Sequence, residues 1–187
     1  MHILGGKAKG RKILTLSTKE CRPTLQIVRK SIFDILGTDV REARVLDLYS
    51  GTGSLGIEAL SRGSQRATFV DESRRALEVL RKNVEELGFE ERADLVEGDA
   101  VRTLLRLSKK GMSYHIVFAD PPYDRNPISE ILEAFRVSDV LRKGGFLIVE
   151  HSKHTELPFR IGRLVLWKAK QFGETRVSFY RKEKELS

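Results

Sequence analysis

Short apolar runs alternate along most of the chain with longer segments that repeat apolar residues at helical spacing. The short runs resemble buried strands, and the longer segments resemble amphipathic helices. We therefore expect strands at 44–49, 67–71, 93–97, 115–120 and 145–150, and helices at 54–62, 73–87, 100–108 and 128–141. Repeated strand–helix units build a parallel sheet with helices on both faces. The pattern predicts an α/β fold with a doubly wound, mostly parallel sheet.

The C-terminal part of the chain departs from this alternation. Two strand-like runs, at 163–170 and 175–181, are separated by Gln171-Phe172-Gly173-Glu174, which is typical of a hairpin turn. We expect an antiparallel hairpin that completes a seven-stranded sheet. Trp167 lies in this hairpin and is expected, like most of the phenylalanines, to be a sheet or core residue rather than a platform for base stacking.

The N-terminal segment combines a β-like stretch at 12–16 with a predicted helix that Thr24 can cap and Gly37 can end. Arg29 and Lys30 are expected on the polar face of that helix. Its apolar stripe consists of Leu25, Val28, Ile32, Ile35 and Leu36.

The sharpest change of composition lies near residue 38, and we see no internal repeat or low-complexity linker. We therefore expect residues 1–38 to form a short extension made of a hairpin and a helix. Residues 39–187 are expected to form one domain.

Positive charge is concentrated in the first 30 residues. The whole chain has a net charge of +8, and residues 1–30 hold eight basic residues against Glu20 alone. A basic segment of this kind is typical of phosphate binding. The alternative is a solvated terminus, although the interleaved glycines favour an ordered segment. The candidate RNA contacts are Lys7, Lys9, Arg11, Lys12 and Arg22.

Several other chemistries lack their characteristic residues. The single Cys21 cannot form an internal disulfide, and the four histidines have no recognised zinc spacing, so no metal is predicted. The phosphate loop of nucleotide hydrolases and the Gly-x-Ser-x-Gly turn of serine hydrolases are both missing. With no signal peptide or long apolar run, the chain is expected to be soluble and cytoplasmic.

A glycine turn follows the first predicted strand of the domain. Gly51-Thr52-Gly53-Ser54-Leu55-Gly56 lies between a strand and a helix, where glycine lets the backbone approach a ligand closely. Asp71 ends the next strand, twenty residues after Gly51, and suits ribose hydroxyls. Asp71 could instead cap the helix that begins near Ser73, and Asp99 is similarly ambiguous.

Nicotinamide dinucleotides and S-adenosylmethionine both bind to such a layout. Asp47, four residues before Gly51, would repel a pyrophosphate and suits a cationic amino-acid group. A chain of 187 residues also leaves no room for the separate catalytic domain of many dehydrogenases. These features favour S-adenosylmethionine.

Asp120-Pro121-Pro122-Tyr123 follows the fourth predicted strand. Two prolines make a stiff turn with free carbonyl oxygens, so Asp120 and the Pro121 carbonyl could accept both hydrogens of a planar amine. Tyr123 could stack on the ring that carries the amine. The alternative is a stiff loop with Tyr123 in the core.

Together these motifs resemble Rossmann-like, S-adenosylmethionine-dependent methyltransferases, and specifically the RsmD family of 16S rRNA guanine-N2 methyltransferases. The more specific part of the resemblance lies outside the two central turns. It consists of the opening Ile3-Leu4-Gly5-Gly6-Lys7-Ala8-Lys9-Gly10-Arg11-Lys12, the segment Arg22-Pro23-Thr24, and Gln171 to Thr175. The Asp-Pro-Pro-Tyr turn also resembles that of DNA and protein N-methyltransferases.

The resemblance implies specific roles for the site residues. Asp47, Tyr49, Gly51 and Gly53 would lie at the methionine end of the cofactor. Asp71 would bind its ribose, and Asp99 with Ala100 its adenine. Asp120, Pro121, Pro122 and Tyr123 would hold an unstacked guanine whose N2 attacks the sulfonium methyl in line, with Asp120 orienting the amine first.

The implied partner is small-subunit ribosomal RNA, either free or within a ribosomal particle, and the chain is expected to act as a monomer without a membrane. Two other functions remain open from the residues. One is methylation of a planar amine in DNA or protein, which would not need the basic extension. The other is a non-catalytic RNA-binding assembly factor, against which the intact site residues argue.

Overall fold

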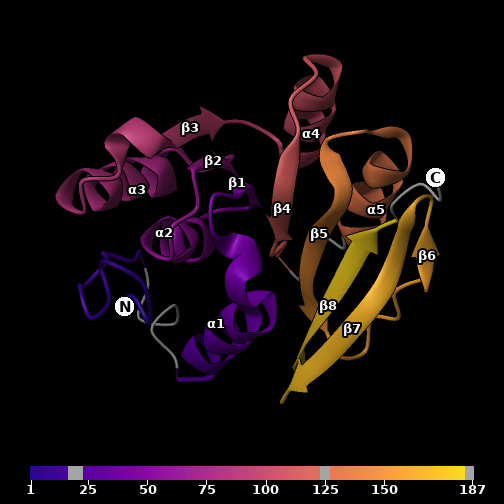
Figure 1. The fold of residues 1–187 in the computed structure, drawn as a ribbon, viewed down its shortest axis with the longest axis horizontal. Coiled ribbons are helices and arrows are strands. Elements are labelled where there is room, and N and C mark those ends of the chain that lie inside the picture. Colours follow the sequence, from indigo (N-terminus) through magenta and orange to yellow (C-terminus); the bar gives the residue numbers. More distant parts are fainter. Residues whose placement is uncertain (17–22, 123–126, 184–187) are drawn as a thin grey trace.

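The computed structural model describes residues 1–16, 23–122 and 127–183 and contains one sheet flanked by helices (Figure 1). The strands lie in the order β3-β2-β1-β4-β5-β8-β7-β6. The strand bounds are β1 Arg44–Leu48, β2 Arg66–Asp71, β3 Ala93–Glu97, β4 Tyr114–Ala119, β5 Leu141–Ser152, β6 Arg160–Ile161, β7 Leu164–Phe172 and β8 Thr175–Lys182. The helices are α1 Pro23–Leu36, α2 Ser54–Ser61, α3 Arg74–Glu86, α4 Ala100–Lys109 and α5 Ile128–Val137, with short 3-10 turns η2 Gly37–Val40 and η3 Glu90–Arg92.

The pairing confirms the predicted fold class. Strands β1 to β5 are parallel to one another, whereas β8 runs antiparallel to both β5 and β7. The predicted hairpin is therefore present, but the sheet has eight strands in the described part of the chain rather than seven. The additional β6 pairs Arg160 with Val165 and Ile161 with Leu164. Two residues are too short for any hydrophobic periodicity, so the pattern could not predict this strand.

The helix predicted at 128–141 is shorter than expected, since α5 ends at Val137 and β5 begins at Leu141. Val140 and Leu141 continue the apolar pattern of the helix, which explains the wrong boundary. In the structure both are buried beside β4, where the Tyr114 amide donates to the Val140 carbonyl at 2.8 Å. Pairing with the sheet outweighs the local helical preference here.

Two hydrophobic clusters cover opposite faces of the sheet. Side chains of α1, α2 and α3 pack with Val45, Phe118 and Ile148 on one face. Side chains of α4 and α5 pack with Leu46, Val117 and Val149 on the other. Neighbouring residues of one strand therefore contribute to different clusters, as expected of a sheet buried on both faces.

The first sixteen residues fold back on themselves and pack against the domain. The Ile3 amide donates to the Arg11 carbonyl at 3.0 Å, and the Ile13 amide donates to the Met1 carbonyl at 2.9 Å. The Ser61 hydroxyl of α2 donates to the Gly5 carbonyl at 2.6 Å. A Cβ on Gly6 would lie 1.9 Å from the Ser61 carbonyl oxygen, so only glycine allows this close approach. Contacts with α2 therefore order the segment.

Arg29 does not lie on a polar face of α1, as the sequence pattern had suggested, because only 3% of it is exposed. Its Nε lies 3.6 Å from the Glu58 carboxylate of α2, and its guanidinium also contacts the Met1 sulfur and the His2 carbonyl. Glu58 in turn pairs with Arg62 at 2.8 Å and accepts from the Leu4 amide at 2.8 Å. Amphipathic spacing could not reveal this role, since the partners come from elements far away in the sequence.

We expect Arg29→Met to lower the free energy of unfolding by about 3 kcal/mol, because it leaves Glu58 buried with one cation fewer. Urea unfolding followed by circular dichroism would measure the change. Lys30→Met is the matched control: its ion pair with Asp34 joins two side chains that are more than half exposed, so its effect should stay below about 0.5 kcal/mol. Equal losses in the two variants would contradict the structural role of Arg29.

Candidate active site

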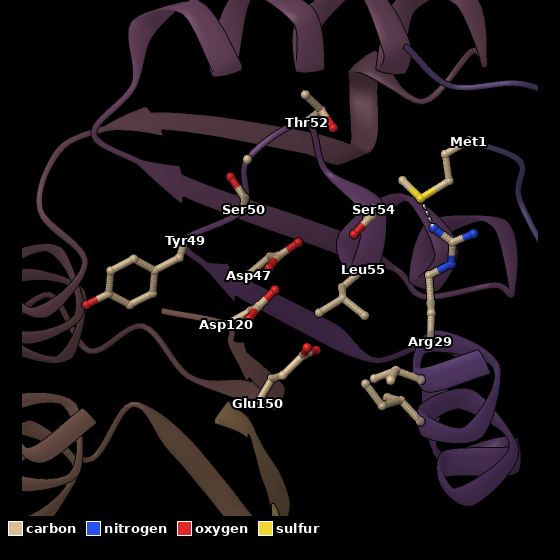
Figure 2. A pocket seen from close by; sticks show the side chains of 13 residues that line it. Met1, Arg29, Asp47, Tyr49, Ser50, Thr52, Ser54, Leu55, Asp120 and Glu150 are labelled. Carbon is tan, nitrogen blue, oxygen red and sulfur yellow. Dashed lines mark hydrogen bonds between the residues drawn. The ribbon is translucent and has the colours of Figure 1, made fainter. Parts of the chain in front are cut away.

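Three carboxylates meet at one edge of the sheet, at the ends of adjacent strands. Asp47 lies in β1, Asp120 follows β4, and Glu150 lies near the end of β5. The register places Leu48 beside Ala119 and Ala119 beside Val149, so the three strands bring these side chains to the same edge. Figure 2 shows the three carboxylates pointing into a common pocket, which encloses about 210 Å³. The order of the strands reverses at β1 and β4, which is the usual ligand position in such sheets.

The glycine turn holds Asp47 and its surroundings in place. The Gly56 amide, in the first turn of α2, donates to the Asp47 carboxylate at 2.9 Å. Gly53 precedes this helix with a φ of 91°, and a Cβ there would lie 2.2 Å from Leu80 Cδ1. A larger residue at Gly53 would therefore be excluded by both backbone conformation and packing. Gly51 lines the pocket directly.

The pocket strongly perturbs two of its acids. Asp47 is only 2% exposed, and this burial raises its pKa to about 7. The hydrogen bond from Gly56 lowers the pKa, whereas the charges of Asp120 and Asp71 raise it further. Asp120 is exposed and lines the pocket, and partial desolvation by the surrounding protein raises its pKa to about 6. Two acids with raised pKa values create a site in which a bound cation would be strongly favoured.

Tyr49 shows backbone strain at the edge of the same pocket. Its φ is 60°, a conformation that residues with a side chain rarely adopt and that is concentrated at functional sites. Its backbone leads from Asp47 into the glycine turn, and Figure 2 shows its ring directed away from the three carboxylates. Burial raises the pKa of its phenol to about 12, so the ring remains neutral.

Asp71 supports the glycine turn rather than capping the following helix. One carboxylate oxygen accepts from the Gly51 amide at 2.7 Å and the other from the Ser73 amide at 2.8 Å. The cap of α3 is Ser73, whose hydroxyl accepts from the Ala76 amide. The helix-cap alternative for Asp71 was therefore wrong, and its predicted contact with ribose stays a prediction.

Asp99 and Ala100 lie at the start of α4. Asp99 is the helix cap and accepts from the Arg102 amide at 2.7 Å, while Ala100 is buried in the cluster beneath the helix. Neither residue lines the pocket that contains Asp47. Their predicted role in binding adenine remains untested by this geometry.

The structure places part of the Asp-Pro-Pro-Tyr turn. Pro121 is buried and Pro122 is exposed directly after Asp120. Tyr123 lies outside the described residues, as does Arg22 of the proposed RNA contacts. Within the described ranges, no group of three or more histidine, cysteine or acidic side chains is arranged to hold a metal ion.

The remaining candidate RNA contacts lie on the folded N-terminal segment. Lys7 places its ammonium group 4.9 Å from the centre of the Phe89 ring, and the Arg11 guanidinium donates to the Glu86 carbonyl. Lys9 and Lys12 are exposed. Met1 of the same segment lines the pocket, so this basic segment borders the site.

Glu150 and Ser50 are among the pocket residues that were missed in the sequence. Glu150 is only 7% exposed and was treated as the last residue of an apolar strand, although its position matched the ends of the strands carrying Asp47 and Asp120. That match was the available signal. Ser50 has a buried hydroxyl for which the described residues provide no hydrogen-bond partner. A small hydroxyl before a glycine gave no comparable signal.

The residues present fit the methionine end of S-adenosylmethionine. Asp47, Asp120 and Glu150 provide negative charge for an ammonium and a sulfonium group, and the Ser50 hydroxyl is available to a polar ligand. The glycine turn keeps the backbone around them free of side chains. A pyrophosphate, by contrast, would face three carboxylates and be repelled.

We expect protonated Asp47 to stabilise the folded, ligand-free protein. This stabilisation is fully present below about pH 4 and is lost as the pH rises to about 7. The reason is that the unfolded carboxyl ionises near pH 4 whereas the folded one remains protonated up to about 7. Asp47→Asn should remove this pH dependence and raise the free energy of unfolding at pH 8 by about 2 kcal/mol.

Urea unfolding at several pH values would test this expectation. Asp34→Asn, which changes an exposed acid on α1, should shift stability by less than about 0.5 kcal/mol at every pH. A stability difference between wild type and Asp47→Asn that does not change from pH 4 to pH 8 would contradict the burial of an ionisable Asp47.

The model of the family described as Conserved hypothetical protein 95 matches residues 1–181. Ribosomal RNA small subunit methyltransferase D of Escherichia coli (strain K12) is 31% identical over 98% of this chain and 90% of its own length. YlbH of Bacillus subtilis is 34% identical over 97% of this chain and 99% of its own. The solved structure of yhhF from Escherichia coli superposes with a TM-score of 0.85 at 30% identity, and 99% of each chain is covered.

These matches extend over the basic N-terminal segment, the sheet and the C-terminal hairpin together. They confirm the resemblance inferred from the motifs. The chain therefore belongs to the Conserved hypothetical protein 95 family, which is the RsmD family of ribosomal RNA methyltransferases.

Proposed function

We propose that this protein transfers the methyl group of S-adenosylmethionine to the exocyclic N2 of a guanine in small-subunit ribosomal RNA. The observation that carries the proposal is the meeting of Asp47 and Asp120 in one pocket. Asp47 lies in β1 and accepts from Gly56 of the glycine turn, where a methyl donor would bind, and Asp120 begins the turn suited to a planar amine. Donor and acceptor would thus be held side by side. Family membership supports the same reaction class.

The residues of the pocket divide the work between binding and orientation. S-adenosylmethionine, when bound, supplies an electrophilic methyl group. Asp47 and Glu150 would balance its positive charge. Asp120 would accept a hydrogen bond from the guanine amine and direct the nitrogen lone pair towards the methyl group. After transfer the nitrogen is acidic, so Asp120 or water can take its proton.

RNA recognition would begin with the N-terminal segment. Lys9 and Lys12 are exposed for phosphates, and Met1 of the same segment lines the pocket. A phosphate backbone bound there would pass close to the site. The guanine must leave its stack to enter, so a loop nucleotide would be the least costly substrate. The proposal also includes the division of the chain into an extension, residues 1–38, and a catalytic domain, residues 39–187. The protein would act as a monomer, on free RNA or on an assembled particle.

Methyl transfer to small ribosomal subunits and to their deproteinised RNA would test the proposal. Both would come from cells that lack this protein, and labelled S-adenosylmethionine would be the donor. We expect N2-methylguanosine in nucleoside analysis of one or both substrates. Absence of incorporation despite measured cofactor binding would contradict the proposed substrate and redirect the search to amines of DNA and protein.

Two substitutions of Asp120 would separate orientation from proton removal. Asp120→Ala removes the acceptor and should lower kcat/KM by roughly 100-fold, as expected when a reacting group is misplaced. Asp120→Asn retains an acceptor oxygen and should keep a substantial part of the activity. Equal losses in the two variants would show instead that the carboxylate acts as an essential base.

The third carboxylate generates a prediction about ligand charge. S-adenosylmethionine carries a sulfonium charge that S-adenosylhomocysteine lacks, so Glu150→Gln should reduce the preference for the former by roughly fivefold. Isothermal titration calorimetry with both ligands would measure it. Glu133→Gln, an exposed acid on α5, is the control. An unchanged preference in Glu150→Gln would show that Glu150 does not sense the charge at sulfur.

A further inference from the structure

The C-terminal hairpin presents an open surface on the outer part of the sheet. Strand β6 pairs only with Leu164 and Val165, and residues 167–171 of β7 are all exposed. Figure 1 shows β7 on the far side of β8 from α1, beyond the helices of that layer. Strands β6 and β7 contribute no residue to the lining of the catalytic pocket.

Trp167 is the most notable residue of this surface: it lies in the sheet, as expected from the sequence, but it is 48% exposed and therefore not a core residue. The pairing of β7 with β8 shifts register between Leu166 and Lys168, which explains why alternation misplaced the ring. Its ring centre lies 5.6 Å from that of Phe146, at an interplanar angle of 53°. Phe146 therefore supports the indole from the side of β5.

Cations surround these two rings. Lys168 places its ammonium 5.6 Å from the centre of the Trp167 ring, and Arg181 places its guanidinium 5.3 Å from that of Phe146. In the register of β7 with β8, Lys168 lies opposite Phe179 and Lys170 lies opposite Val177. Phe179 and Val177 belong to the same hydrophobic cluster as Phe146, so the two lysines lie on the face of the sheet that carries Phe146. Within the described chain neither lysine has an ion-pair partner.

The hairpin as a whole is strongly basic. Residues 164–182 contain Lys168, Lys170, Arg176, Arg181 and Lys182 against Glu174 alone. The hairpin sequence therefore carries +4, although Lys182 is buried and pairs with Asp139. A groove of about 480 Å³ is lined by Trp167, Arg181 and Glu183, and Lys168 and Lys170 lie exposed along the same strand as Trp167. An aromatic ring beside exposed basic side chains is the arrangement that binds single-stranded nucleic acid through stacking and phosphate contacts.

The surface lies on the same side of the sheet as the catalytic pocket. Phe146, Ile148 and Glu150 alternate along β5 and therefore point to one face. Glu150 lines the pocket, and the four-residue separation from Phe146 corresponds to about 13 Å along the strand. One RNA molecule could therefore contact both places.

We propose that this hairpin surface binds a single-stranded segment of the RNA substrate, with a base stacked on Trp167 and phosphates on Lys168, Lys170 and Arg181. The proposal rests on the proposed function for the identity of the RNA. It concerns a surface distinct from the N-terminal segment, so the protein would hold its substrate at two basic regions. A protein strand that pairs with the exposed edge of β7 is the competing occupant, but lysines along an edge disfavour such pairing.

The chain contains a single tryptophan, so its fluorescence reports directly on this surface. Titration with deproteinised small-subunit RNA, and with a 20-nucleotide single-stranded RNA of mixed sequence, should quench the emission as a base stacks on the ring. Trp167→Ala should weaken binding of both RNAs by about tenfold, as measured by filter binding. Trp167→Phe should restore most of the affinity.

A Lys168→Glu/Lys170→Glu double variant should weaken binding further and reduce the slope of log affinity against log salt by about two. Phe159→Ala is the matched control, since this aromatic residue is 67% exposed but does not line the groove. Its RNA affinity should equal that of the wild type. Thermal unfolding of each variant would confirm that the sheet is intact.

Absence of quenching together with unchanged affinity in Trp167→Ala would overturn the proposal. Quenching by small-subunit proteins but not by RNA would overturn it in favour of a protein partner. These readouts do not depend on methyl transfer, so failure of the proposed reaction and failure of this surface are distinguishable. Failure of the reaction would appear as missing N2-methylguanosine while RNA still quenched Trp167.

Discussion

The burial of Asp47 beside a second acid is the constraint on which the rest of this site depends. Asp47 is almost fully buried and has one amide donor, from Gly56, rather than a cationic partner of its own. Asp120 adds a second acid at the neighbouring strand end. The protein tolerates this arrangement because protonation can neutralise the acids when the pocket holds no ligand. A ligand with positive charge would replace those protons, which links binding to the ionisation of the site.

This constraint explains the placement of Arg29. A cation beside Asp47 and Asp120 would neutralise them permanently. Figure 2 shows the guanidinium of Arg29 directed towards Met1 and away from these two acids, and Arg29 pairs with Glu58 instead. Arg29 therefore ties the N-terminal segment and α2 to α1 without removing the negative charge that a cofactor needs. The same contacts place Met1 in the pocket wall, so the basic segment and the reaction site share one piece of structure.

The fold and part of the site could be predicted from the sequence because their signals are local. Apolar runs marked the parallel strands. Asp47, near the end of the first strand and before the glycine turn, and Asp120, directly before its prolines, marked the ligand edge. Glu150 escaped because no glycine or proline accompanies it, although topology places it beside Asp120. The burial of Arg29 depends on partners far away in the sequence, and the exposure of Trp167 depends on a register shift. The spacing of apolar residues along the chain predicts neither. Local patterns thus predict where strands end, but not which distant residues complete the pocket.

Recognition of an rRNA nucleotide needs more than a pocket for one base, since the same Asp-Pro-Pro-Tyr chemistry suits several planar amines. Specificity must come from contacts outside the pocket, which read the shape and position of the surrounding RNA. The two basic regions of this chain lie at its ends in sequence, in the N-terminal segment and in the C-terminal hairpin. The N-terminal segment packs against α2 and places Met1 in the pocket wall, whereas the hairpin forms the outer part of the sheet. Under the two proposals, one RNA contact would be joined to the reaction site and the other would lie beyond it, so only the hairpin contact could change without altering the pocket wall.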